Sequence, residues 1–470
     1  MSSTMTRRAL LRWGAVGAGA MVLAACAPKQ APAEPAPKEE APAAKEPTVA
    51  PAAKEEAKPA AAGAITLRFM TRQGDAGVHM REFGKRYADE SEGKIVVEFE
   101  EAPWDETPKI LETQLISGTM VDATWGDTAW WPNMARRGAY LDIEEYVAEA
   151  GMNLDDWFNV AWFRRWTDGK LSGLGGAAGF HPGITFYNKE WVVEAWGKEP
   201  TDDWTLEDFT ECINACAKLK GEGYFGGNAD VGGGHGGDGW LGPFNGGLLS
   251  QDGTQAIFAE PEAQDGIKWQ IEQLASKAIP TREDQAEGLM QMFLNQKLAT
   301  YTSNPGASQG MSKGAEENNI DMGVVLSPKG PSASLNPPQR GFCPYANTFG
   351  AYSKTKYPRE AFGLIARVTS EECMKWLCLT TGKQPGALLT TWYDSEVVEK
   401  FPWFPKCADV MKTITDAFAC PANTRYNEWR DVGNNEIPAI VYGDVEYTDA
   451  NVQAVNDHMQ EVLDLPMPGA

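Results

Sequence analysis

Ile65-Thr66-Leu67-Arg68-Phe69-Met70 is the stretch that decides the fold class, because apolar and polar residues alternate along it as in a half-buried β-strand. Outward from this strand, the sequence predicts an amphipathic helix over 80–90, a strand over 94–99, a helix over 106–116 and a strand over 121–125. Strands and helices that alternate at this spacing form βαβ units with parallel strands. The chain is therefore predicted to have an α/β fold.

The alternation continues along the chain, with more helix toward the C-terminal end. A folded body of about 400 residues is larger than a single core usually becomes, so two domains are expected. One helix has a clear start, because Thr205 followed by Asp208 is a capping-box-like pattern. The remaining strands are expected at 171–178, 184–188, 298–302, 322–326 and 349–352, and the remaining helices at 135–147, 205–220, 262–276, 284–295, 358–382, 394–400, 405–418 and 448–464.

The N-terminal part of the chain indicates export and a tether. Residues 1–25 combine the twin arginines Arg7 and Arg8 with a weakly apolar stretch, which is typical of a Tat-like signal peptide. They lead into Ala24-Ala25-Cys26, which resembles a bacterial lipobox and predicts lipidation of Cys26. Residues 26–63 are almost entirely Ala, Pro, Lys and Glu and are predicted to be a disordered linker. We therefore expect an exported protein, lipid-anchored to the outer face of the cell membrane or periplasmic.

Charge and composition exclude several classes of function. The formal net charge of −23 disfavours nucleic acid and anionic membrane surfaces, so the lipid anchor is the expected membrane contact. The chain has four His and no C-x-x-C pair, so no metal site is predicted. The Gly-rich segment 226–247 lacks the Lys and spacing of a phosphate loop, and no cofactor is expected. Among the cysteines after Cys26, Cys407 and Cys420 flank a predicted helix and are the better candidate disulfide pair.

Five short segments form a recognisable series along the chain. They are Asp168-Gly169-Lys170-Leu171-Ser172-Gly173-Leu174, Ile184-Thr185-Phe186-Tyr187-Asn188-Lys189-Glu190, Thr201-Asp202-Asp203-Trp204-Thr205-Leu206-Glu207-Asp208-Phe209, Phe293-Leu294-Asn295-Gln296-Lys297-Leu298-Ala299 and Gly323-Val324-Val325-Leu326-Ser327-Pro328-Lys329-Gly330. Taken in this order, they resemble segments of family 1 of the bacterial extracellular solute-binding proteins, which includes maltose-binding protein. The resemblance implies a substrate-binding lipoprotein of an ABC importer. Two departures are that Gly175-Gly176 replaces a usual Pro, and Gln296 replaces a usual Gly.

This resemblance implies a two-lobed periplasmic-binding-protein-like fold of type II, with hinged lobes and a ligand cleft between them. Lobe 1 would comprise 64–180 plus 324–385, and lobe 2 would comprise 181–323 plus 386–470. Ligand would lie at the carboxyl ends of strands, and the lobes would close around it by a hinge motion. The resemblance also implies a protein that is not an enzyme and that passes its solute to ABC permease subunits with a cytoplasmic ATPase. We expect a monomer.

A sugar site needs flat aromatic faces and planar polar groups that grip hydroxyls. The candidates lie at predicted strand ends or in segments where the resemblance places the cleft. Each aromatic could instead pack in a core, Asp127 could cap the helix that follows it, and only one of Trp130 and Trp131 is expected to face inward. The candidates are Arg72, Gln73, Asp75, Trp125, Asp127, Trp130, Phe180, His181, Trp240, Asn245, Asn304, Tyr426 and Trp429.

Alternative functions remain open at this point. A glycosidase would need two carboxylates across the scissile bond, and Asp75 and Asp127 could converge, but no catalytic signature accompanies them. Other possible solutes are a polyamine, ferric iron, a peptide or an organic acid. The 17 Trp, with few Lys or His near the predicted cleft, favour a neutral, ring-shaped solute over an anion. A sugar or oligosaccharide is therefore the predicted ligand, while its identity and size are left open.

Overall fold

The computed structural model describes residues 63–181, 183–229, 231, 240–250, 252–330, 340, 343–413 and 425–466, without the side chains of His181, Cys343 and Thr413. All of these residues belong to one unit of the chain that starts at Lys58. The predicted signal peptide, Cys26, nearly all of the linker and Cys420 lie outside the described residues. In the part of the chain that is described, no helix is long and apolar enough to cross a membrane.

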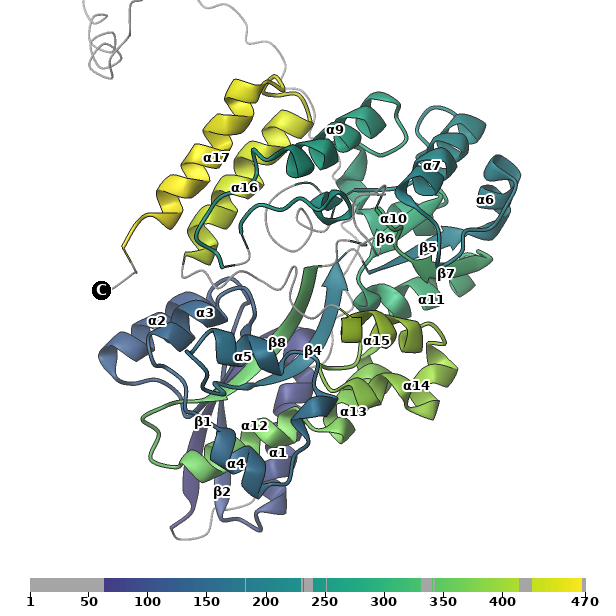
Figure 1. The fold of residues 1–470 in the computed structure, drawn as a ribbon. Helices are drawn as coiled ribbons and strands as arrows, with labels where there is room; N and C mark the ends of the chain where they lie inside the picture. The colour runs from purple at the N-terminus through teal and green to yellow at the C-terminus, as the bar shows by residue number, and fades with distance from the viewer. Residues whose placement is uncertain are drawn as a thin grey trace, which may run out of the picture. The chain divides into compact units, whose positions relative to one another are not determined.

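The first sheet has five strands in the order β2-β1-β3-β8-β4. β1 runs parallel to β2 and β3, whereas β8 is antiparallel to its neighbours β3 and β4. The helices α1 (Val78–Glu90) and α12 (Pro358–Val368) pack beside each other against this sheet (Figure 1). The strands are β1 (Ile65–Arg72), β2 (Ile95–Ala102), β3 (Ala123–Asp127), β4 (Leu174–His181) and β8 (Cys343–Ala351).

The second sheet has three strands in the order β6-β5-β7, and the central β5 (Ile184–Asn188) is antiparallel to both neighbours. The chain passes from the first sheet to the second between β4 and β5. It returns after β7 (Met322–Leu326), which pairs with β5 along its whole length. The predicted lobe boundary at 324 falls inside this strand, so a boundary after Leu326 keeps β7 with its sheet. The third strand is β6 (Thr300–Ser303).

Helices surround both sheets. Toward the C-terminus, α16 and α17 lie side by side, next to α9 (Figure 1). The helices not yet named are α2 (Thr107–Ser117), α3 (Trp131–Arg136), α4 (Glu144–Glu149), α5 (Val160–Arg165), α6 (Lys189–Trp196), α7 (Leu206–Lys220), α9 (Pro261–Ala275), α10 (Leu289–Leu294), α11 (Ser308–Glu317), α13 (Glu371–Thr381), α14 (Ser395–Lys400), α15 (Phe404–Thr413), α16 (Tyr426–Val441) and α17 (Asp449–Leu463).

Three hydrophobic clusters form the core. The first joins the first sheet to the α9, α16 and α17 region, the second surrounds β5 and α15, and the third lies beneath α6 and α7. Trp130 and Trp131 are both buried in the first cluster, at 2% and 0% exposed, so the expectation that only one faces inward was wrong. Both rings are enclosed because each has its own aromatic partners, Trp104 and Trp125 for Trp130, and Tyr140 for Trp131.

The structure corrects three further predictions. The helix expected over 135–147 is interrupted, because Gly138 takes a left-handed φ of 71° between α3 and α4. The helix expected over 358–382 divides at Ser370, whose side chain accepts a hydrogen bond from the Cys373 N–H and caps α13. Cys407 has a free thiol buried in the second cluster, so it forms no disulfide with Cys420 in this structure.

Candidate ligand-binding site

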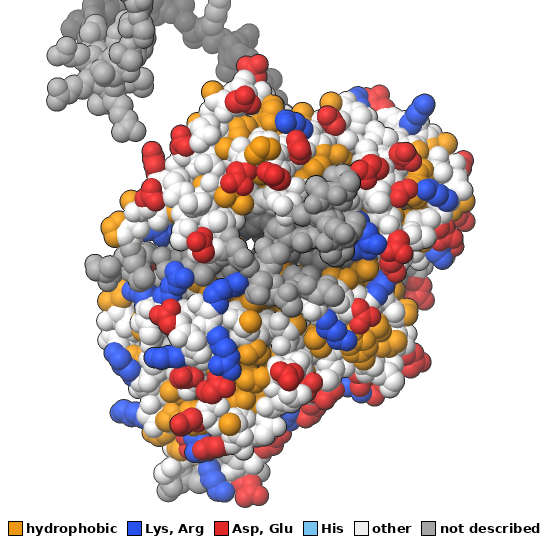
Figure 2. All heavy atoms as spheres, viewed as in Figure 1, with side chains coloured by type: hydrophobic (Ala, Val, Ile, Leu, Met, Phe, Trp, Pro, Cys, Tyr) orange, Lys and Arg blue, Asp and Glu red, His pale blue; other side chains and the backbone are white. Residues whose placement is uncertain are grey.

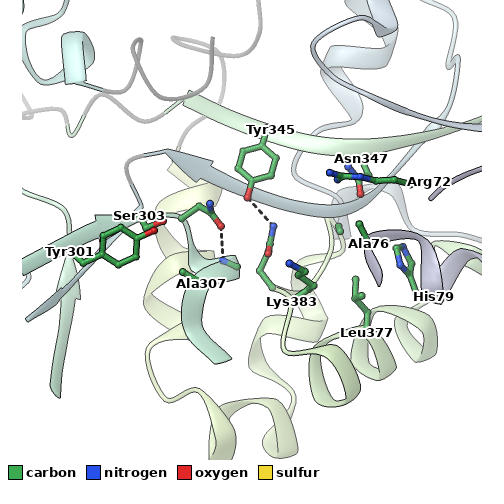
Figure 3. Close-up of a pocket in the computed structure, with 14 residues that line it drawn as sticks. Arg72, Ala76, His79, Tyr301, Ser303, Ala307, Tyr345, Asn347, Leu377 and Lys383 are labelled. Carbon is green, nitrogen blue, oxygen red and sulfur yellow. Dashed lines mark hydrogen bonds between the residues drawn. The ribbon is translucent and has the colours of Figure 1, made fainter. Parts of the chain in front are cut away.

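A cavity of about 360 Å³ lies between the two sheets (Figure 3). Residues at the carboxyl end of β1, on β8 and on β4 form one side, and residues at the end of β6 and the start of α11 form the other. The segment after α13 closes it. The lining residues are Arg72, Ala76, His79, Ala177, Tyr301, Ser303, Asn304, Gly306, Ala307, Tyr345, Asn347, Leu377, Lys383 and Gln384.

Arg72 ends β1 and points its side chain into this cavity (Figure 3). Its guanidinium carbon lies 5.7 Å from the ring centroid of Trp125, the central residue of β3. The side chain is about half buried, and this desolvation lowers its pKa, while the nearby Asp127 carboxylate raises it. Among the described residues, no hydrogen bond or ion pair is made by the guanidinium. Arg72 is therefore a cation at the cavity with no hydrogen-bond or ion-pair partner for its guanidinium in the described part of the chain.

Apart from Lys383, the other polar side chains that line the cavity are neutral, and hydrogen bonds fix two of them. Gln384 donates from Nε2 to the Tyr345 hydroxyl at 2.9 Å, and Asn304 Oδ1 accepts from the Gly306 N–H at 2.8 Å. Burial raises the pKa of the Tyr345 phenol, and Asp127 adds to this effect, so the hydroxyl stays protonated. His79 is 1% exposed with both ring nitrogens unpartnered, and burial lowers its pKa to about 3. The cavity thus offers pre-oriented hydroxyl, amide and imidazole groups.

Three tryptophans from the first-sheet side extend this site beyond Arg72. The Trp130 ring lies 4.8 Å from that of Trp104 and 5.6 Å from that of Trp125, in both cases edge-to-face. Asp127 Oδ2 accepts from Trp104 Nε1 at 3.4 Å, and Oδ1 accepts from the Ala129 N–H at 3.0 Å. This second bond closes a turn, and Trp130 rather than Asp127 is the N-cap residue of α3. The three rings and Asp127 form a rigid wall next to Arg72.

The start of α16 completes this wall from the C-terminal side. A second cavity of about 190 Å³ lies between Trp130 and Tyr426 and is lined by residues of α2, α3 and α16. Four residues after Tyr426, Arg430 places its guanidinium carbon 5.4 Å from the Trp104 ring and 5.7 Å from the Tyr426 ring. We call Trp104, Trp125, Trp130, Tyr426 and Arg430 the aromatic wall. It joins the first sheet to the C-terminal helices.

Buried donors along the aromatic wall have no partner in the described structure. They are the indole Nε1 atoms of Trp125 and Trp130 and the Nε atom of Arg430. A buried polar group left without a hydrogen bond costs about 1–3 kcal/mol. Such groups are expected where a ligand supplies the missing acceptor. By contrast, nowhere in the described residues do three His, Cys, Asp or Glu side chains come together as metal ligands would.

The sequence pattern of the bacterial extracellular solute-binding proteins matches residues 81–406, which is most of the chain. The chain belongs to this family. Because the family is extracellular, membership implies that this solute-binding protein is exported. Among curated proteins, none matches the sequence significantly.

Solved structures show the same fold. The sugar-binding protein MalE from Xanthomonas citri has a TM-score of 0.69 at 17% identity, over 85% of this chain and 97% of its own. An ABC substrate-binding protein from Listeria monocytogenes in complex with cycloalternan has a TM-score of 0.68 at 16% identity, over 86% and 100%. The GacH receptor of Streptomyces glaucescens has a TM-score of 0.67 at 16% identity, over 85% and 98%. The predicted two-lobed α/β binding-protein fold is thereby confirmed.

The structure brings together part of the residue set that the sequence predicted for this solute-binding protein. Arg72 and Asn304 line the larger cavity, and Asp127 lies between it and the aromatic wall. Trp429 is 1% exposed behind Tyr426, with the two rings edge-to-face at 5.3 Å. The predicted residues that meet here are Arg72, Trp125, Asp127, Trp130, Asn304, Tyr426 and Trp429.

The other predicted residues lie elsewhere. Gln73 and Asp75 are exposed in the turn after β1. Phe180 belongs to the second hydrophobic cluster. His181 pairs through its backbone with Cys343, and its side chain is not described.

The two predicted residues of the Gly-rich segment also lie away from the site. Trp240 is in the third hydrophobic cluster, stacked on Trp269 at 5.1 Å and 12° and on Phe209 at 5.5 Å. It is a core residue because three flat rings pack there in parallel. Asn245 is exposed and takes a φ of 64°, so it serves the turn after a short 3₁₀ helix.

Sequence reasoning missed several residues of the site. Tyr345 and Asn347 alternate along β8, but the predicted strand began only at 349. Arg430 follows Tyr426 by four residues on a helix that was not predicted, and this spacing would have placed both on one face. The other missed residues are His79, Trp104, Tyr301, Lys383 and Gln384.

Proposed function

We propose that this solute-binding protein captures a carbohydrate between two hinged lobes and delivers it to the permease of an ABC importer. The lobes are those predicted from the sequence, 64–180 plus 324–385 and 181–323 plus 386–470, with the return boundary moved to follow Leu326. The observation that carries the proposal is the cavity between the two sheets, where Arg72 lies both in the lining and beside Trp125 of the aromatic wall. Flat rings beside fixed polar groups suit the apolar faces and hydroxyl edges of a sugar.

Two structures of similar fold support a carbohydrate ligand. The Listeria monocytogenes protein was solved with cycloalternan, and the Streptomyces glaucescens receptor was solved with acarbose and an acarbose homolog. These binding proteins share the two-lobed arrangement, which supports the same class of guest here.

We further propose that the bound solute is not chemically altered. A glycosidase mechanism needs two carboxylates facing each other across the bond. Asp75 is exposed, whereas Asp127 is 5% exposed and already accepts from Trp104 and the Ala129 backbone. Among the described residues that line the larger cavity there is no Asp or Glu. The pair that the sequence left open as catalytic therefore has no support from the site.

The delivery role rests on the N-terminal segment as well as on the site. We propose a Tat-like export signal, a lipidated Cys26 and a monomeric body that reaches its permease on a disordered tether. Cys26→Ser in a bacterial host is expected to abolish labelling by radioactive fatty acid and to move the protein from the membrane to the soluble exported fraction. A Cys26→Ser protein that remains acylated and sediments with membranes would refute the anchor.

The binding proposal is tested by calorimetry against linear and cyclic oligosaccharides, with chromatography of each ligand after overnight incubation. Trp104 is only partly buried, so Trp104→Ala should fold while losing at least about tenfold in affinity for the sugar that binds. The matched control is Trp196→Ala, which should bind the sugar normally. Trp196 is a partly exposed tryptophan of α6 that lies beside Lys198. Cleavage of the sugar, or equal affinity in the Trp104 variant, would contradict the proposal.

A further inference from the structure

The charges around the candidate site are opposite in sign to those of the chain as a whole. The chain carries a net charge of −23, yet the described residues that line the larger cavity include Arg72 and Lys383 and no carboxylate. Arg430 adds a third cation at the aromatic wall. On the face drawn in Figure 2, basic side chains also gather over the region of α2, α3 and α5. The site is therefore a locally positive region of an acidic protein.

Among the described residues, Arg72 and Arg430 lack the ion pair that some other partly buried arginines form. Arg137 pairs with Glu112, and Arg367 pairs with Glu90 and with Glu372. In the described part of the chain, neither Arg72 nor Arg430 forms an ion pair or donates a guanidinium hydrogen bond. A charge removed from water without a partner is costly, so its retention requires a reason.

Aromatic rings lie beside both guanidinium groups. Arg72 lies over Trp125, and Arg430 lies over Trp104 and Tyr426, all within 5.7 Å of the ring centroids. Cation–π contact uses the face of the guanidinium and leaves its N–H edge for another partner. The edge of an arginine matches a carboxylate in a two-bond arrangement. These two side chains are thus pre-organised to receive an anion.

The hydrogen-bonding groups left over along the aromatic wall include three donors. In the described structure, the buried Nε1 atoms of Trp125 and Trp130 and the Nε of Arg430 have no acceptor. The carboxylate that acts on Arg72 belongs to Asp127, which already accepts from Trp104 and Ala129. Every hydroxyl of a neutral sugar brings a donor of its own, whereas a carboxylate only accepts. A surplus of protein donors is therefore better matched by an acidic sugar.

We propose that the solute is a carbohydrate that carries a carboxylate, such as a uronic or aldonic acid, and that Arg72 and Lys383 bind this group. The inference rests on the proposed function, since it names the class of sugar for the same site. It replaces the neutral solute that the sequence favoured. The same charges disfavour the polyamine and ferric iron alternatives.

Matched pairs of sugars test the proposal by isothermal titration calorimetry at low salt. The probes are galacturonate and galactose, glucuronate and glucose, gluconate and glucose, and trigalacturonate and α-1,4-linked galactotriose. At least one acid is expected to bind about 100-fold more tightly than its neutral counterpart, and its affinity should fall as salt is added. A neutral sugar that binds as well as or better than its acid overturns this inference and leaves the proposed function standing. If no acid binds, this inference fails, and if no sugar of either kind binds, the proposed function fails with it.

Variants assign the preference to named residues. Arg72→Gln is expected to lower affinity for the acid at least tenfold, with less effect on any neutral sugar, and Arg72→Lys should restore part of it. Lys383→Gln removes an exposed side chain, so it should lower the same affinity without affecting folding. Arg68→Gln is the control, since Arg68 lies on the same strand and pairs with Glu100. An unchanged preference for the acid in both Arg72→Gln and Lys383→Gln would overturn the assignment.

Discussion

At the scale of single residues, the imidazole of His79 is the clearest link between burial and pH. Both ring nitrogens are buried and unpartnered, and burial lowers the pKa to about 3, against about 6.5 in an unfolded chain. Between these two values the unfolded state binds more protons, so the free energy of unfolding falls as the pH drops below about 6.5. At pH 5 the loss attributable to His79 should be about 2 kcal/mol.

Urea unfolding of the wild type and of His79→Leu, at pH 7.5 and at pH 5, measures this contribution. Leucine has a similar volume and no proton to gain, so the variant should lose about 2 kcal/mol less than the wild type over this interval. His458→Gln is the control, because His458 is exposed on α17 beside Glu436 and the variant should keep the wild-type slope. An identical pH slope in His79→Leu would show that the buried imidazole is not the cause.

The Trp131 ring packs directly against Gly126, so the size of one side chain limits the size of the other. It stacks on Tyr140 at 3.8 Å and donates from Nε1 to Ser172 at 3.2 Å. A Cβ at Gly126 would lie 2.6 Å from the Trp131 ring. Trp131→Ala should cost about 3–5 kcal/mol, and Gly126→Ala about 1–3 kcal/mol.

In the double variant, part of the Gly126→Ala cost should disappear, because the ring that obstructs the new methyl group is gone. A double-mutant cycle by denaturant unfolding is expected to give a coupling of at least about 1 kcal/mol. Strict additivity of the two losses would mean that the glycine serves another purpose, such as the approach of Thr348.

Some residues of the site could be predicted from the sequence because they lie at the ends of predicted strands. Arg72 and Asp127 end β1 and β3, where parallel strands deliver their side chains to one edge. Trp240 could not be placed this way, because a Gly-rich sequence does not indicate whether a tryptophan ring packs in the core or contacts a ligand. That difference depends on Phe209 and Trp269, which only the tertiary structure brings beside it.

At the scale of elements, the start of α7 was predictable because its signal is local. The Thr205 side chain accepts from the Asp208 N–H at 3.3 Å, and the Asp208 carboxylate accepts from the Thr205 N–H at 3.2 Å. Thr205→Ala should lower the free energy of unfolding by about 1 kcal/mol. Thr113→Ala, an exposed threonine inside α2, should change it by less than about 0.5 kcal/mol. Equal effects of the two substitutions in urea unfolding would argue against the capping box as the source.

Other elements gave weaker signals for physical reasons. α5 and α6 have six and eight residues, too few for a 3.6-residue period to stand out. α16 buries Tyr426, Trp429 and Ile437 on one face, but Pro438 lies inside it and its other positions include several Asn and Asp. Such residues have low helix propensity, so tertiary packing rather than local preference forms this helix. For this reason the sequence did not predict Arg430 as a residue of the site.

At the scale of the whole folded body, the chain passes between the sheets in a way that favours a hinge. β4 and β8 pair with each other in the first sheet. In the chain, β4 is followed by β5 of the second sheet, and β8 follows β7 of that sheet. The segment after α13 joins them, since the Ala387 N–H donates to the Gly176 carbonyl at 2.8 Å. Bending at a few such neighbouring connections lets two packed bodies rotate without disturbing either core.

Ligand binding should therefore contract this solute-binding protein. The cavity and the aromatic wall contain residues from both sides of the connections, so a bound sugar gains contacts as the sides approach. Small-angle X-ray scattering with the sugar that binds most tightly should show a smaller radius of gyration than without it. Arg72→Gln at the same sugar concentration should contract less, in proportion to its lower occupancy. Full occupancy by calorimetry with an unchanged radius of gyration would mean that the body is rigid and that the guest enters a preformed cavity.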